Sequence, residues 1–187
     1  MIPHWHPSTG TLPTIRPGEP GHSEDRSPYR CTFTQLVERF ATSQPRIAIL
    51  QGLLGYRQAL ALQGIVEGFQ WIDGSFVENC EVIRGRPPSD IDVVTFMFIP
   101  AGCDQRKLVP LFTPDLTKSN FKVDAYAMYL GRPCDAVYTR RIAYWYSMWS
   151  HRKTNDVWKG FLQIDLAPSQ DADAEILINN ISTAGIP

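Results

Sequence analysis

The sequence predicts a mixed α/β (α+β) protein in which a small mixed β-sheet is flanked by helices. Two observations lead to this prediction. Segments with helix signals alternate along the chain with segments rich in β-branched and aromatic residues. Hydrophobic residues make up 43% and charged residues 20% of the chain, which is typical of a globular protein. A chain of 187 residues can build one substantial core, so one domain is expected.

Residues 1–30 are expected to form an extended, proline-rich N-terminal arm, and residues 31–187 the single domain. Proline removes a backbone donor and blocks helix, and the arm has prolines at positions 3, 7, 13, 17, 20 and 28. The arm is expected either to lie over the domain or to remain mobile. Its apolar side chains could attach it: Ile2, Trp5, Leu12 and Ile15.

The domain begins with two predicted helices, a short one over residues 33–40 and a longer one ending near Gly64. Ser43 is the expected N-cap of the longer helix, with Pro45 in its first turn. Strands are predicted over residues 68–73, 90–99 and 121–129, with a helical or irregular connection over 103–119. The remainder is expected to give a helix over 135–150, a strand within 158–166 and one last helix in the acidic tail.

Charge and cysteine usage exclude several classes of protein. A net charge of −1 and an isoelectric point near 6.4 create no overall field toward nucleic acid or anionic membranes. The four cysteines form no C-x-x-C pair, which argues against a zinc ribbon and favours reduced thiols. No apolar run approaches the roughly 18 residues of a membrane span, and the first residues lack a signal-peptide centre. A cytoplasmic protein without membrane contact is expected.

Three aspartates are the candidate catalytic residues and metal ligands: Asp90, Asp92 and Asp124. Alternation along a strand puts Asp90 and Asp92 on one face, and Asp124 joins them if its strand pairs with theirs. Adjacent carboxylates repel unless a cation neutralises them, and hard oxygen ligands suit Mg²⁺ or Mn²⁺. An isolated Asp-x-Asp is also compatible with a solvated strand start and a loop cap.

Gly74 and Ser75 are the candidate phosphate-binding residues, because they directly follow a predicted strand and open a helical turn. Ser75 alone could equally be an ordinary N-cap, and Asp73 is expected to be a cap or hydrogen-bonding partner. Guanidinium and ammonium groups bind phosphate, so nucleotide contacts are also expected from basic residues near these segments. These are Arg84, Arg86 and Lys122, with Lys118 nearby.

At these residues the chain resembles the DNA polymerase β-like nucleotidyltransferase superfamily. That pattern is a strand ending in Gly-Ser, an Asp-x-Asp on the next strand and a further acid on a later strand. It is matched here by Gly74-Ser75, Asp90 with Asp92, and Asp124, within residues 68–128. The segment 84–89 makes the gap before the Asp pair slightly longer than usual. The segments "IPHWHPSTGTLP", "WIDGSFVE" and "WKGFLQIDL" further resemble small uncharacterised bacterial proteins of that superfamily linked to mobile elements or defence.

The resemblance implies a nucleotidyltransferase fold and transfer of an NMP from an NTP, most simply ATP, to an acceptor. Asp90 and Asp92 would be metal ligands, and Asp124 a ligand or the base for the acceptor hydroxyl. Because the chain is short, a protein hydroxyl or an RNA (tRNA) end is the expected acceptor, with a toxin-antitoxin or phage-defence role and a partner protein as further expectations. Two alternatives stay open: a catalytically silent antitoxin or binding module, and a synthase of a nucleotide second messenger.

The segment 138–159 interleaves aromatic and basic residues, a combination that can bind nucleic acid. Helical spacing favours a structural interpretation instead. It predicts a stripe that faces the core: Ile142, Trp145, Met148 and Trp149.

Overall fold

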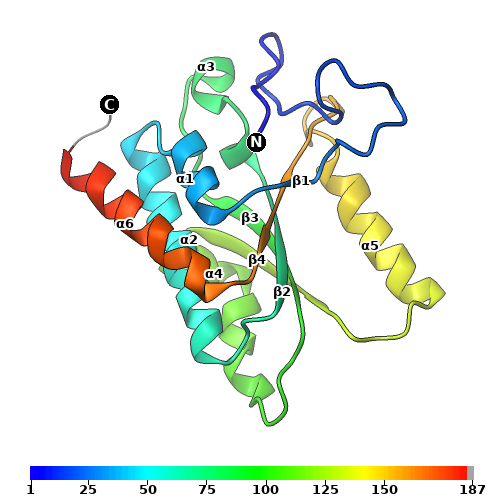
Figure 1. Cartoon of the computed structure of the whole chain (residues 1–187), viewed down its shortest axis with the longest axis vertical. Helices are drawn as coiled ribbons and strands as arrows, with labels where there is room; N and C mark the ends of the chain where they lie inside the picture. Colours follow the sequence, from blue (N-terminus) through cyan, green and yellow to red (C-terminus); the bar gives the residue numbers. More distant parts are fainter. Residues whose placement is uncertain (185–187) are drawn as a thin grey trace.

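The computed structural model describes residues 1–184, which form a five-stranded mixed sheet and six α-helices (Figure 1). The predicted mixed α/β (α+β) fold class is therefore confirmed. The strands are β1 (Tyr29–Arg30), β2 (Gly68–Asp73), β3 (Ile91–Met97), β4 (Val123–Tyr129) and β5 (Leu162–Asp165). The helices are α1 (Phe33–Phe40), α2 (Gln44–Leu62), α3 (Cys80–Arg84), α4 (Pro114–Phe121), α5 (Ala136–Trp149) and α6 (Pro168–Ala184).

The order of strands in the sheet is β1-β5-β2-β3-β4, with β2 and β3 near the centre. Strand β3 pairs antiparallel with β2 and parallel with β4, while β5 pairs antiparallel with β2 and parallel with β1. The register places Asp73 of β2 opposite Asp92 of β3, and Asp92 opposite Asp124 of β4. Three aspartates thus form one row across three neighbouring strands.

Helices cover both faces of the sheet unequally. Helices α1, α2, α4 and α6 lie on one side, and α5 lies alone on the other (Figure 1). The larger core includes Ile72, Val93 and Ala125 on the first side. The smaller core, on the α5 side, contains Val94 and Trp145. Because side chains alternate along each strand, residues 92, 94 and 96 of β3 face α5.

Most predicted elements are present, and the differences have local causes. Strand β4 begins at Val123 instead of residue 121, because α4 extends to Phe121 and Lys122 ends it with a left-handed φ of 57°. Strand β5 is shorter than the predicted segment 158–166, because the chain before it pairs elsewhere: Gly160 N donates to the Leu12 carbonyl over 2.7 Å. The five-residue helix α3 was not predicted.

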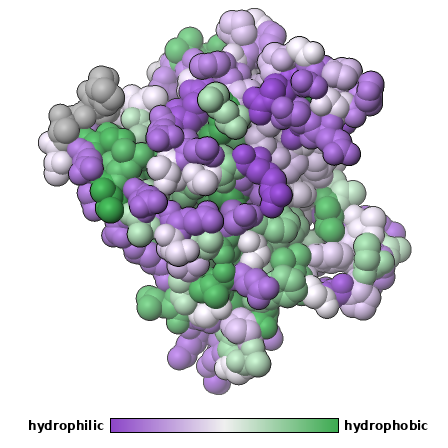
Figure 2. All heavy atoms as spheres, in the orientation of Figure 1, coloured by the Kyte–Doolittle hydropathy of each residue, from purple (hydrophilic) through white to green (hydrophobic). Residues whose placement is uncertain are grey.

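The N-terminal arm lies over the domain, which was one of the two arrangements left open by the sequence. Ile2 and Leu12 are buried, and the Trp5 indole Nε1 donates to the Val77 carbonyl over 2.8 Å. By contrast, residues 17–22 are exposed, and Figure 2 shows mainly hydrophilic side chains over this part of the arm. The arm therefore contributes core side chains close to the turn that follows β2.

Helix α5 begins at the expected place and buries only part of the predicted stripe. Its N-cap Asp135 accepts a hydrogen bond from the Tyr138 backbone N–H over 2.7 Å. Trp145 and Trp149 are buried as predicted, but Met148 is 42% exposed, so the stripe was wrong at this position. The smaller core needs only one narrow face of the helix, because α5 packs against the sheet without a second helix beside it.

Within residues 1–184, no helix combines the length and the apolar character required to cross a membrane. All four cysteines, at positions 31, 80, 103 and 134, are free thiols. This agrees with the expectation drawn from their spacing.

Candidate active site

A tight turn after β2 brings the backbone against the carboxylate of β3. Gly74 has a φ of +86°, and a Cβ atom there would lie 2.5 Å from Asp92 Oδ2. Both facts require glycine. Ser75 follows in a single 3-10 turn, and Arg46 of α2 donates to the carbonyls of Phe76 and Glu78 over 2.6 Å each. The fully buried Arg46 side chain thereby fixes the turn to the larger core.

The row of aspartates lies on the sheet face that α5 covers, at the end of the strands. Asp73 and Asp124 are buried, and Asp92 is half-buried between them. Burial, together with the charges of Asp73, Asp90 and Asp124, raises the pKa of Asp92 to about 7. The pKa of Asp73 rises to about 6, mainly through burial. Negative charge is thus concentrated and poorly hydrated here.

Lys118 of α4 provides a cation beside two of these carboxylates. Its Nζ lies 2.6 Å from Asp124 Oδ2 and 3.6 Å from Asp90 Oδ2. The hydrogen bond to Asp124 raises the pKa of Lys118. The second oxygen, Asp124 Oδ1, is buried and has no hydrogen-bond partner among the described residues. Across residues 1–184, no three His, Cys, Asp or Glu side chains already surround one point as a metal site.

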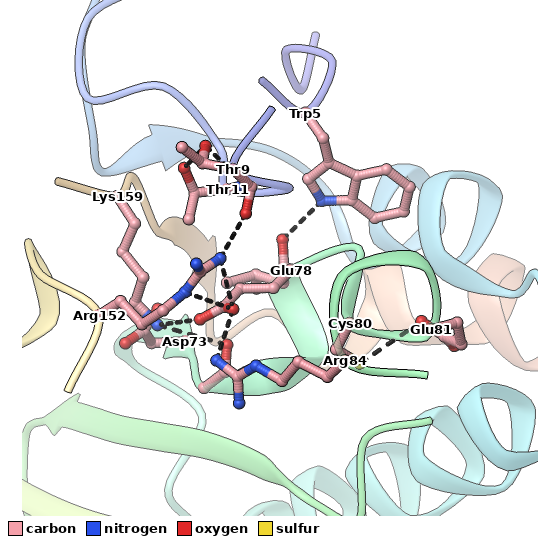
Figure 3. A network of polar contacts seen from close by, with 12 residues as sticks. Trp5, Thr9, Thr11, Asp73, Glu78, Cys80, Glu81, Arg84, Arg152 and Lys159 are labelled. Carbon is pink, nitrogen blue, oxygen red and sulfur yellow. Dashed lines mark hydrogen bonds and ion pairs between the residues drawn. The ribbon is translucent and has the colours of Figure 1, made fainter. Parts of the chain in front are cut away.

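Glu78 is the centre of a buried network of cations (Figure 3). One carboxylate oxygen lies 2.7 Å from Arg84 Nη2 and 3.0 Å from Arg152, and the other lies 3.3 Å from Lys159 Nζ. Lys159 Nζ is also 3.0 Å from Asp73 Oδ1, as an ion pair without the angle of a hydrogen bond. Although burial opposes the charge of Lys159, Asp73 and Glu78 outweigh it, and its pKa is raised.

One cavity of about 910 Å³ is lined by both groups of charges, which meet at the ion pair of Asp73 and Lys159. Among the predicted site residues, those that line it are Gly74, Ser75, Arg84, Asp92 and Asp124. Asp90 is not part of the lining, although Lys118 links it to Asp124. Arg86 and Lys122 are exposed and lie outside the lining. The structure therefore brings together five of the predicted residues and leaves these two basic residues apart.

Several lining residues were not predicted to belong to the site. They include Glu78, Tyr126, Arg152, Trp158 and Lys159. In a sequence, an isolated Arg, Lys or Glu resembles a surface residue, and only the tertiary structure shows that Glu78, Arg152 and Lys159 are buried. Tyr126 had a usable signal, because it lies two residues after Asp124 on the same strand and must share its face.

Comparison with known proteins gives a family without an assigned activity. Residues 3–165 match a family described as a family of unknown function (DUF6932). No curated protein matches the chain, and no solved structure does. The match covers nearly all of the arm, every residue that lines the cavity and all five strands. The chain therefore belongs to the DUF6932 family.

Proposed function

We propose that this protein is a nucleotidyltransferase that uses Mg²⁺ or Mn²⁺ to transfer an NMP from an NTP, most simply ATP, to a hydroxyl of a protein or of an RNA end. The observation that supports this most directly is the combination of charges that line the cavity. Aspartates from three adjacent strands lie next to three cations that surround one buried glutamate, and the two groups meet at Asp73 and Lys159. A metal–triphosphate has the complementary distribution of charge.

The carboxylates that would bind the metal fit a hard divalent cation by their chemistry. Asp90, Asp92 and Asp124 offer carboxylate oxygens, and the pKa of Asp92 is raised to about 7 by burial and by like charges that a cation would neutralise. Gly74 leaves the space beside Asp92 Oδ2 that any side chain would fill. When bound there, the metal would activate the attacking hydroxyl and stabilise charge on the phosphates.

The cationic wall of the cavity, which consists of Arg84, Arg152 and Lys159, fits the phosphates of the nucleotide. Gly74 and Ser75 line the same cavity as Asp92 and Asp124, and the Arg84 side chain is 27% exposed. Arg152 and Lys159 are buried, and their positive charges add to that of Arg84. Glu78 balances one of these three positive charges, and Asp73 of the aspartate row pairs with Lys159.

In the proposed reaction, the acceptor oxygen attacks the α-phosphorus, and the bond from that phosphorus to the leaving pyrophosphate breaks. The hydroxyl proton needs an acceptor. Asp124 suits this role because Lys118 holds its Oδ2 while its buried Oδ1 has no partner among the described residues. Asp124 is also close enough in the sheet to Asp92 to share in metal binding.

Transfer can be tested with labelled NTPs, Mg²⁺ or Mn²⁺, and a lysate that contains protein and RNA. The wild type should label an acceptor, and the double variant Asp90→Ala/Asp92→Ala should lose on the order of 10³-fold in rate, since a bound metal supplies several kcal/mol. Asp173→Asn is a matched control, because this exposed carboxylate lies on α6, on the far side of the sheet. Equal labelling by the wild type and the double variant would refute the proposal, as would no labelling by either.

Lys118 gives a second test that needs only the metal. Its ammonium occupies the position between Asp90 and Asp124 where a divalent cation would bind, so the two cations should compete. Lys118→Met is expected to raise Mn²⁺ affinity about tenfold, because one nearby positive charge is removed. Mn²⁺ titration followed by electron paramagnetic resonance measures this, with the exposed Lys107→Met as control. Unchanged affinity in the Lys118 variant would show that the two cations do not compete.

A further inference from the structure

We infer that Trp158, which packs against His151, forms the subsite for the base of the nucleotide. The inference rests on the proposed function and assigns to the same cavity a second, aromatic part that binds a planar nucleobase. Trp158 and His151 both line the cavity that contains Asp92 and Arg84. Their rings lie with centroids 4.2 Å apart and planes inclined by 46°.

Trp158 differs from the other tryptophans in its exposure. Three of the five tryptophans are buried in the smaller core, at 5–9% exposure, and Trp5 of the arm is half-buried. Trp158 is 63% exposed. The ring therefore contributes little to the core, while most of its surface stays available to a ligand in the cavity.

The backbone around Trp158 is fixed, which makes the ring a defined surface. Residues 151 and 158 form an antiparallel bridge, and Arg152 N donates to the Val157 carbonyl over 2.8 Å. Lys159 N donates to the Ser150 carbonyl over 2.9 Å on the other side of the ring. The ends of this loop, residues 150–159, are thus closed by hydrogen bonds, and a ligand that binds to the ring need not order the backbone there.

The same loop connects the Trp158 ring to the cationic wall. Arg152 and Lys159 both pair with Glu78. Lys159 directly follows Trp158 in the sequence, and Arg152 lies earlier in the same loop. Polar side chains of the loop, Thr154 and Asp156, also line the cavity and could contact the edge of a base. A cavity of about 910 Å³ is large enough for a whole nucleotide. Phosphates bound beside Asp92 and the cationic wall would therefore leave the base close to Trp158 and His151.

The chemistry favours a nucleobase over other planar ligands. Every base has a π-face, and stacking on an aromatic side chain contributes to binding for all four bases. A purine offers a larger stacking area than a pyrimidine, so ATP and GTP should bind more tightly than CTP and UTP. Stacking does not involve the phosphates, and this separates the inference from the proposed function.

The experiment uses calorimetry in the presence of Mg²⁺ to compare tripolyphosphate with an ATP analogue that has a methylene group between the α and β phosphates. The matching UTP analogue measures the preference for the base. Trp158→Ala should weaken binding of the analogue about tenfold and leave tripolyphosphate binding unchanged. Trp158→Phe should retain most of the affinity, because it keeps an aromatic face. Tyr144→Ala is the matched control, since Tyr144 is 56% exposed and lies outside the cavity lining. The preference for the adenosine over the uridine analogue should disappear in Trp158→Ala.

Three results would overturn the inference while the proposed function stands. They are unchanged analogue affinity in Trp158→Ala, an equal loss for the analogue and for tripolyphosphate, and intact analogue binding with a selective loss of acceptor labelling. The last result would assign the ring to the acceptor. If the wild type binds neither ligand, the proposed function fails and the base subsite fails with it.

Discussion

Replacing Glu78 with alanine is expected to lower the free energy of unfolding by about 3–5 kcal/mol, since removing one partner of a buried ion pair leaves uncompensated charge. The effect is large because one carboxylate pairs with Arg84, Arg152 and Lys159 at once. Arg152 and Lys159 are themselves buried. Urea denaturation followed by circular dichroism measures the change.

The control for this prediction is Glu67→Ala, because Glu67 is exposed and has no such network. Its effect should stay within about 0.5 kcal/mol. Glu78→Gln should fall between the two, since the amide oxygen keeps one acceptor but loses the charge. If Glu78→Ala proves as stable as Glu67→Ala, the network does not hold the cationic wall in place.

Asp92→Asn is expected to make the metal-free protein more stable at neutral and alkaline pH, by roughly 1–2 kcal/mol at pH 8, because an unfavourable buried charge is removed. In the folded protein the pKa of Asp92 is raised from 3.8 to about 7 by burial and by Asp73, Asp90 and Asp124. The folded state therefore binds the proton more tightly than the unfolded state. This carboxyl makes stability fall as pH rises from about 4 to about 7, with the full cost present above that range.

The measurement is urea denaturation with EDTA between pH 5 and pH 8. The wild type should lose stability relative to Asp92→Asn across this range, and the exposed Asp173→Asn should follow the wild type. Parallel curves for the wild type and Asp92→Asn would contradict the prediction. Under the proposed function, Mg²⁺ should also raise the Tm of the wild type and leave that of Asp92→Asn almost unchanged, because the variant lacks one ligand charge.

The sequence alone determined the fold class, most element positions and the placing of Asp92 beside Asp124. The β-branched run over residues 91–97 and the cap at Ser43 are local signals, and local signals suffice for strands and helices. The prediction that Asp124 joins Asp92 required only that their strands pair, and they do. Alternation within each strand then brings both carboxylates to one face.

Only the tertiary structure brought together the cations around Glu78 and the rings of His151 and Trp158. Glu78 and Lys159 are 81 positions apart in sequence, and nothing in their local sequence shows that they meet. The course of the arm was likewise open, because proline-rich sequence excludes helix without indicating where the chain packs. Local propensity fixes an element from its own residues, but burial and charge pairing depend on contacts between distant segments. Asp92 and Asp124 could therefore be predicted from a motif, whereas the place of Asp73 beside them and the buried cations could not.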